Sequence, residues 1–244
     1  MEDENDVGQT LALIHTSPAL TPMFKSLCAK YLPDTTIFHM VDESLIADTV
    51  REGRLRRVTV RRLISLIESA EQAGADVVMV TCSSVGPAAS MAKQLFDIPV
   101  IRVDEAMAEA AVRMGRRIGV MATLSTTLGP TVALLREKAV EANIEIEVYE
   151  ALCNGALDAA LNGDSATHDR ILSEALKHHM QHVDVVVLAQ ASMARVVKAL
   201  PAGTLSAPVL SSPELAVKSA RAVLSALTVG RDVLVSSVGG ETKP

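Results

Sequence analysis

The chain has 244 residues, a net charge of −6, and a composition that is 49% hydrophobic, 21% charged and only 2% aromatic. This length is enough for one large domain or for two domains of about 120 residues each. Because so few aromatic rings leave no platform for stacking bases, and an acidic chain has no electrostatic reason to bind a polyanion, we expect no nucleic-acid partner.

The first residues, the apolar runs and the cysteines indicate the cellular compartment of the protein. Residues 1–6 are acidic where a signal peptide is basic, and no apolar run approaches the roughly 18–20 residues that cross a bilayer. Cys28, Cys82 and Cys153 cannot all pair, and none has the spacing of a metal site. We therefore expect a soluble protein of the reducing cytoplasm that has no membrane partner and no metal.

Strands and helices alternate along the whole chain. In the first half, the hydrophobic pattern predicts strands over 10–16, 37–41, the run that ends at Cys82, and 100–103. Helices are predicted from Pro18 onward and over 45–50, 55–73, 88–95 and 104–114. Such alternation is typical of α/β folds with right-handed crossovers and mostly parallel sheets.

The second half repeats this order. Strands are predicted over 118–122, 144–149 and 184–189, and helices over 128–142, about 153–161, 166–181, 192–199 and 213 to about 227. We expect the last helix to pack on the first half, and the tail from Gly230 onward to be loosely held.

Cys82 stands where a continuous apolar run gives way to small hydroxyls and glycine. Such a run predicts a strand that is buried on both faces, and ligands of α/β sheets bind at the carboxyl ends of the strands. We also expect the start of the following helix to lower the pKa of this thiol. Cys82 is therefore the main catalytic candidate, whereas Cys28 and Cys153 are interpreted as structural.

The sequence around Cys82 has a counterpart about a hundred residues later. Val77 matches Val185, and Cys82 then matches Gln190. The first strands of the two halves also match, so that Thr16 aligns with Thr123. A period of this length indicates a duplicated domain rather than a solenoid repeat. We predict two similar three-layer α/β domains with mostly parallel sheets and the active site in the cleft between them. The predicted domains are residues 1–104 with 213–244, and residues 105–212.

Further polar residues follow the predicted strands. Hydroxyls stand at strand ends in both halves, at Thr16, Ser17, Thr123, Thr126 and Thr127. They suit helix capping and carboxylate binding equally. His15 ends the first strand and is a candidate acid–base group.

Two other clusters are interpreted as solvated helix surfaces. One contains His178, His179 and His182, which lack the third ligand of a zinc site. The other is the basic run with arginines at 51, 54, 56, 57, 61 and 62, which could also contact a phosphate or a partner subunit.

Three motifs carry a resemblance to a known family. They are Val80-Thr-Cys82-Ser-Ser84, Gly119-Val-Met-Ala-Thr123-Leu-Ser-Thr126 and Val186-Val-Leu-Ala-Gln190-Ala-Ser192. With the duplicated halves, they resemble the aspartate/glutamate racemase superfamily, which includes hydantoin racemase, maleate isomerase and arylmalonate decarboxylase, over about residues 10–227. The resemblance implies a catalytic thiol at Cys82, with substrate bound by Ser83, Ser84, Thr123 and Thr126.

The chain departs from the family at two places. The family has a second cysteine where this chain has Gln190, which can hydrogen-bond but cannot ionise. The amino-acid racemases have an Asp-Ser pair after the first strand, where this chain has His15, Thr16 and Ser17. A symmetric two-thiol mechanism is therefore not available, and a free amino acid is a less suitable substrate.

We expect a cofactor-independent isomerase or racemase of the superfamily that acts on a small carboxylic acid through a Cys82 thiolate and an enolate-type intermediate. A decarboxylase or other lyase with one-sided protonation is the alternative, and a carboxylate-binding protein without catalysis is a second one. The expected partners are the substrate and further copies of the chain in a homo-oligomer. The expected site consists of Cys82 and His15 as catalytic residues, and of Thr16, Ser17, Ser83, Ser84, Thr123, Thr126, Gln190 and Ala191 as substrate-binding residues.

Overall fold

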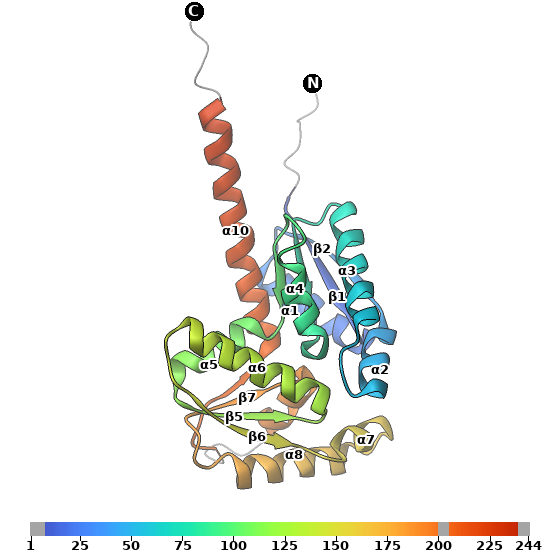
Figure 1. Cartoon of the computed structure of the whole chain (residues 1–244), viewed down its shortest axis with the longest axis vertical. Helices are drawn as coiled ribbons and strands as arrows, with labels where there is room; N and C mark the ends of the chain where they lie inside the picture. Colours follow the sequence, from blue (N-terminus) through green and yellow to red (C-terminus); the bar gives the residue numbers. More distant parts are fainter. Residues whose placement is uncertain (1–7, 200–204, 239–244) are drawn as a thin grey trace, which may run out of the picture.

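The computed structural model describes residues 8–199 and 205–238, and it contains two parallel four-stranded sheets with helices on both faces (Figure 1). In the first half the sheet order is β2-β1-β3-β4. The elements of this half are β1 (Thr10–His15), η1 (Pro18–Leu20), α1 (Thr21–Tyr31), β2 (Thr36–Val41), α2 (Glu43–Glu52), α3 (Arg57–Gln72), β3 (Val77–Val80), η2 (Ser83–Val85), α4 (Gly86–Ala92) and β4 (Val100–Arg102).

The second half has the same strand order, β6-β5-β7-β8, as the duplication in the sequence suggests. Its elements are α5 (Glu105–Met114), β5 (Arg117–Ala122), α6 (Ser125–Glu141), β6 (Glu147–Leu152), α7 (Ala156–Leu161), α8 (Ser165–His179), β7 (Val185–Leu188), η3 (Ala191–Met193), α9 (Ala194–Ala199), β8 (Val209–Ser211) and α10 (Ser212–Val238). The predicted α/β class with mostly parallel sheets is confirmed.

The central strands are apolar on both faces because helices cover both faces of each sheet. In β1, Ala12 and Ile14 pack toward α2, α3 and α4, whereas Leu11 and Leu13 pack toward α1 and α10. The strands of the second half divide in the same way between α5 with α6 on one face and α8 with α9 on the other. This burial explains why β1, β3, β5 and β7 lack the alternation of a half-exposed strand.

The last helix belongs to the core of the first half although it follows the second half in sequence. Ala216, Val217, Ala220 and Leu224 of α10 pack with the face of β1 that carries Leu11 and Leu13. This is the contact that the proposed division into residues 1–104 with 213–244 and residues 105–212 requires. Figure 1 shows α10 passing beside the first sheet and continuing beyond it.

Three predicted boundaries are corrected. The last helix was predicted to end at about Leu227, but α10 continues to Val238, since one glycine does not end a helix that gains a hydrogen bond with each added residue. Of the tail from Gly230 that was expected to be loosely held, residues 239–244 lie outside the described part of the chain. The strand predicted over 144–149 is β6 at Glu147–Leu152, because its position is set by parallel pairing with β5, residue 117 against 147 through 122 against 152. The hydroxyl run before residue 128 forms the first turn of α6.

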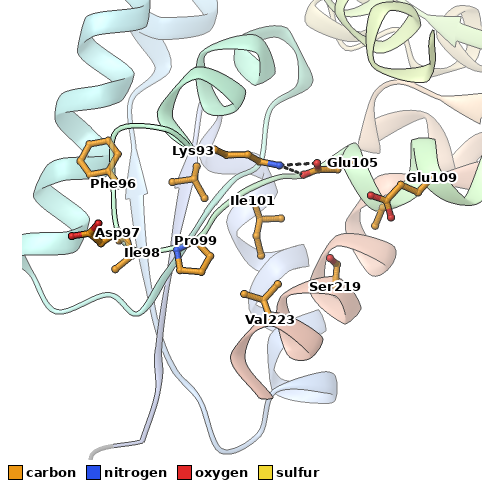
Figure 2. Close-up of a pocket in the computed structure, with 12 residues that line it drawn as sticks. Lys93, Phe96, Asp97, Ile98, Pro99, Ile101, Glu105, Glu109, Ser219 and Val223 are labelled. Carbon is orange, nitrogen blue, oxygen red and sulfur yellow. Dashed lines mark hydrogen bonds and ion pairs between the residues drawn. The ribbon is translucent and has the colours of Figure 1, made fainter. Parts of the chain in front are cut away.

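Ion pairs and hydrogen bonds join the two halves. Lys93, which directly follows α4, donates to both carboxylate oxygens of Glu105 at 2.7 Å, beside a cavity of about 360 Å³ (Figure 2). Lys138 of α6 reaches the same carboxylate at 3.0 Å. Glu105 thus links a helix of the first half to a helix of the second.

Within the described part of the chain, no helix combines the length and the apolar composition needed to cross a membrane.

Candidate active site

A cavity of about 270 Å³ lies where the carboxyl ends of the two sheets meet. Most of its wall consists of residues that directly follow a strand, which is where α/β proteins bind ligands. The lining residues are Thr16, Ser17, Ala19, Leu20, Ile46, Thr81, Cys82, Ser83, Ser84, Val103, Leu124, Thr127, Leu157, Ala189, Gln190, Ala191, Ser192 and Ser212. We refer to this cavity as the cleft.

Cys82 and Gln190 occupy equivalent positions in the two halves. Each residue comes shortly after the third strand of its sheet and precedes a short 3₁₀ helix, η2 or η3. Their backbone angles are nearly the same, with φ −129° and ψ 117° at Cys82 and φ −129° and ψ 134° at Gln190. The duplicated backbone therefore presents a thiol from one half and an amide from the other to the same cleft.

The surroundings of Cys82 change its acidity in opposing ways. Burial raises the pKa of this thiol, and hydrogen bonds from the Thr16 hydroxyl, from the backbone N–H groups of Ser84 and Val85 and from the Ser84 hydroxyl offset part of that effect. The expectation of a lowered pKa is therefore wrong, because desolvation of the thiolate outweighs the donors of the turn. The same donors form a cradle for negative charge at this position.

The other two cysteines are withdrawn from the cleft. Cys28 is 1% exposed and Cys153 is 3% exposed, and neither lines the cavity. Burial raises the pKa of both thiols to about 11. Both are therefore poor nucleophiles at neutral pH.

The Gln190 side chain is fixed by Thr123. Its Oε1 accepts hydrogen bonds from the backbone N–H of Thr123 at 2.6 Å and from the Thr123 hydroxyl at 3.0 Å. Thr123 itself is not among the residues that line the cleft. Thr123, which the family resemblance assigned to substrate binding, thus uses both its backbone N–H and its hydroxyl to bind Gln190.

Thr126 and Thr127 differ in their access to the cleft. Thr126 is buried, its hydroxyl has no hydrogen-bond partner, and it does not line the cleft. Thr127 does line it, and its hydroxyl is 2.7 Å from that of Ser84. Of the two threonines, Thr127 is the one placed to meet a ligand.

His15 lies behind the cleft wall. It is 0% exposed, its Nδ1 is 2.8 Å from the Thr81 hydroxyl, and its Nε2 is 2.9 Å from Nδ1 of His39. Burial, with a smaller contribution from His39, lowers the pKa of His15 to about 4. The predicted direct role in acid–base catalysis finds no geometric support, because His15 reaches the cleft only through Thr81.

The structure thus brings most of the predicted residues together. The cleft contains Cys82, Thr16, Ser17, Ser83, Ser84, Gln190 and Ala191, whereas His15, Thr123 and Thr126 do not line it. Val103 and Ser212 were not predicted, although both follow the fourth strand of their sheet and the duplication could have revealed them. Ile46 and Leu157 come from helices, and no sequence signal points to them.

The other clusters noted in the sequence lie outside the cleft. Several arginines of the basic run pair with acidic neighbours, as Arg62 does with Asp42 and Asp48 at 2.7 and 3.1 Å. His178 and His182 are exposed, and the side chain of His179 is outside the described part. No three His, Cys, Asp or Glu side chains among the described residues are grouped so that they could hold a metal ion.

Known proteins share this fold and this sequence pattern. Residues 13–220 match the family model described as Asp/Glu/Hydantoin racemase. A glutamate racemase from Bacillus anthracis is 18% identical, with 89% of this chain and 82% of that chain covered and a TM-score of 0.68. An allantoin racemase from Klebsiella pneumoniae is 20% identical, with 91% and 89% covered and a TM-score of 0.63. No curated protein sequence matches the chain.

The structural likeness shows the fold, and the match of the family model over most of the chain shows the family. That membership supports an enzyme of the racemase or isomerase type. The chain therefore belongs to the Asp/Glu/hydantoin racemase family.

Proposed function

We propose that the protein is a cofactor-independent isomerase that acts on a small carboxylic acid and uses the Cys82 thiolate as its base. One observation carries this proposal. Among the eighteen described side chains that line the cleft, Cys82 is the only one whose group is more acidic than an alcohol or an amide and can therefore serve as a base. The remainder are hydroxyl, amide and aliphatic groups, so proton transfer inside the cleft depends on this thiol.

The proposed reaction begins with the thiolate removing the proton next to the substrate carboxylate or carbonyl group. The C–H bond breaks, an S–H bond forms, and the electron pair moves onto the oxygen as an enolate. The backbone N–H groups of Ser84 and Val85 and the hydroxyls of Thr16 and Ser84 already surround the sulfur, and further hydroxyls line the cleft. Such donors stabilise developing negative charge because they are oriented before the reaction starts.

The second half of the reaction returns the proton from sulfur to carbon. Return to a neighbouring carbon of a conjugated intermediate moves a double bond. Return to the same carbon from the side of Cys82 restores the original configuration and is detected as proton exchange. The raised pKa of Cys82 makes its thiolate a stronger base, although a smaller fraction of the enzyme carries it at neutral pH.

A decarboxylase is the second candidate, and Gln190 favours it. Decarboxylation needs proton delivery to one face only, and Gln190 leaves the face opposite Cys82 without an ionisable group. Here the C–C bond to the carboxylate breaks, CO₂ leaves, and the electron pair forms the same enolate. Cys82 then donates its thiol proton to the carbon, and solvent replaces that proton.

The test is proton exchange in heavy water. A panel of small carboxylic, unsaturated and malonic acids is incubated with the protein, and deuterium next to the carboxylate is followed by NMR while CO₂ release is measured in parallel. We expect exchange for at least one acid and its loss in Cys82→Ala and Cys82→Ser, with Cys28→Ala as the matched control. If Cys82→Ala exchanges as fast as the wild type, the proposal is wrong. Binding without exchange or CO₂ release would indicate a carboxylate-binding protein.

A further inference from the structure

The orientation of the Gln190 amide is determined by the chemistry of its neighbour. A backbone N–H can only donate a hydrogen bond, so the Gln190 atom 2.6 Å from the Thr123 nitrogen must be the carbonyl oxygen. The hydroxyl of Thr123 gives the same oxygen a second donor at 3.0 Å. The amide therefore cannot exchange its oxygen and nitrogen without losing the bond from the backbone N–H and placing two N–H donors against each other.

This arrangement decides what Gln190 offers to a ligand. Its oxygen is occupied, and no acceptor for its Nε2 is found among the described residues. Gln190 lines the cleft across from the Cys82 half. At this position the second half of the protein thus presents the N–H donors of Gln190 Nε2 to the cleft, and not the acceptor oxygen of the amide.

The remaining wall of the cleft matches this polarity. Among its described lining residues there is no aspartate or glutamate and no other charged side chain. A buried ammonium group needs a paired negative charge as well as acceptors, and the described lining offers hydroxyl acceptors but no negative charge. The oxygen of a carboxylate or an amide, in contrast, would meet donors from both halves. Ala19, Leu20, Ile46 and Leu157 supply an aliphatic surface beside these polar groups.

We propose that Gln190, positioned by Thr123, determines specificity and selects a monocarboxylate whose α-carbon carries no free ammonium, with an N-acylamino acid as the representative class. This inference rests on the proposed function of the same cleft. The Nε2 group of Gln190 donates to an oxygen of the substrate, the aliphatic wall receives its side chain, and acylation removes the positive charge that the cleft cannot pair.

The test compares matched pairs of probes, alanine with N-acetylalanine and leucine with N-acetylleucine. Two measurements are made for each probe, α-proton exchange in heavy water and protection of Cys82 from iodoacetamide, and the second needs no turnover. In the wild type, we expect the N-acetyl acids to exchange faster and to protect better than the free amino acids.

Three variants of Gln190 separate the explanations. Gln190→Glu keeps the size and the two bonds from Thr123 but presents a negative acceptor to the cleft, so it should reverse the preference within each pair. Gln190→Met keeps the size of the side chain but forms no hydrogen bonds. It should reduce exchange of the N-acetyl acids and their protection of Cys82, without increasing either for the free amino acids. Gln190→Ala should slow exchange of N-acetyl acids by about 10²–10³-fold, as for loss of one donor to a developing oxyanion.

Thr123 is tested as a positioning residue. Thr123→Val removes the hydroxyl donor and should reduce the preference for N-acetyl acids, whereas Thr123→Ser keeps the hydroxyl and should restore it. A residue that only supports folding would change the rates for both members of a pair alike.

The outcomes distinguish this inference from the proposed function. A wild-type preference for free amino acids, no protection by any N-acetyl acid, or an unchanged preference in Gln190→Glu would overturn the specificity assignment even where exchange depends on Cys82. Selective protection by N-acetyl acids without any exchange would uphold the assignment and contradict the proposed isomerase.

Discussion

The hydroxyl of Ser84 in the first half lies 2.7 Å from the hydroxyl of Thr127 in the second half, in a buried hydrogen bond that joins the two halves at the wall of the cleft. Ser84 also contributes a hydrogen bond to Cys82 that lowers the pKa of the thiol. A serine hydroxyl has one proton and can also accept, so Ser84 donates its proton to the sulfur when the Thr127 hydroxyl donates to Ser84. The acidity of Cys82 is therefore coupled to the contact between the halves.

This coupling predicts effects in the same direction for two substitutions. Ser84→Ala should raise the pKa of Cys82 by about one to two units, the equivalent of one hydrogen bond to a charged group. Thr127→Val removes the hydroxyl that donates to Ser84, which weakens the bond from Ser84 to the sulfur, and should raise that pKa by less. The pH dependence of iodoacetamide labelling measures both. Thr131→Val, one turn along the same helix, is the matched control, and equal effects of the two threonine variants would contradict the coupling.

Cys82 should react with iodoacetamide before Cys28 and Cys153. It borders an open cavity, whereas the other two thiols are buried and have pKa values raised to about 11. The thiolate is the reactive form, and burial raises the pKa of Cys82. The labelling rate should therefore still rise about tenfold per pH unit above about 8.5, the pKa of an ordinary cysteine. Peptide mass spectrometry identifies the modified residue. Earlier labelling of Cys28 or Cys153 in the folded protein would refute this prediction.

Turnover in heavy water should place deuterium on one face of the product. Among the residues that line the cleft, no second ionisable group faces Cys82. Stereochemical analysis by NMR with a chiral reagent measures the ratio of the two labelled forms. Gln190→Cys introduces a second thiol at the equivalent position and should add labelling on the other face. Two-faced labelling in the wild type that disappears in His15→Asn would instead identify His15 as the second proton-transfer group.

The buried imidazole of His15 should make the protein less stable in mild acid. Its pKa is lowered to about 4 in the folded state, against 6.5 for an ordinary histidine, so the unfolded chain binds the proton more readily. The stability contributed by neutral His15 is fully present above pH 6.5 and is lost as the pH falls toward 4, by at most about 3 kcal/mol. Urea unfolding at several pH values measures this loss. His15→Gln should reduce it, and the exposed His178→Gln should not.

The ion pair of Arg102 and Asp104 is a further buried polar contact with a measurable contribution. The guanidinium Nε and Nη2 donate to the two carboxylate oxygens at 3.1 and 3.0 Å, and the side chains are only 4% and 0% exposed. Removal of one partner leaves an unpaired buried charge, so Arg102→Met should cost about 3–5 kcal/mol of unfolding free energy. Urea unfolding checks this value. As a control, Arg170→Met breaks the exposed ion pair with Glu174 and should cost less than about 1 kcal/mol of unfolding free energy.

The sequence was sufficient for the order of elements and for the two equivalent positions at the centre of the cleft. The apolar runs that end at Cys82 and Gln190 identify buried strands, and a parallel sheet places the carboxyl ends of its strands on one edge. Boundaries were less accurate where pairing or helix propagation decided them, as at β6 and at the end of α10.

Through local pattern alone, the sequence determined the fold class, the duplication and the placement of Cys82 at a strand end. This was possible because buried strands and helices have a characteristic hydrophobic pattern along the chain. The tertiary structure alone decided which polar groups reach the cleft. His15 faces His39 and Thr81, and not the cleft. The N–H group of Thr123 donates to Gln190. The pKa of Cys82 is raised by burial and is not lowered by a helix start. These properties depend on contacts between residues far apart in sequence and on the loss of solvent around them, and neither is encoded in the neighbours of a residue along the chain.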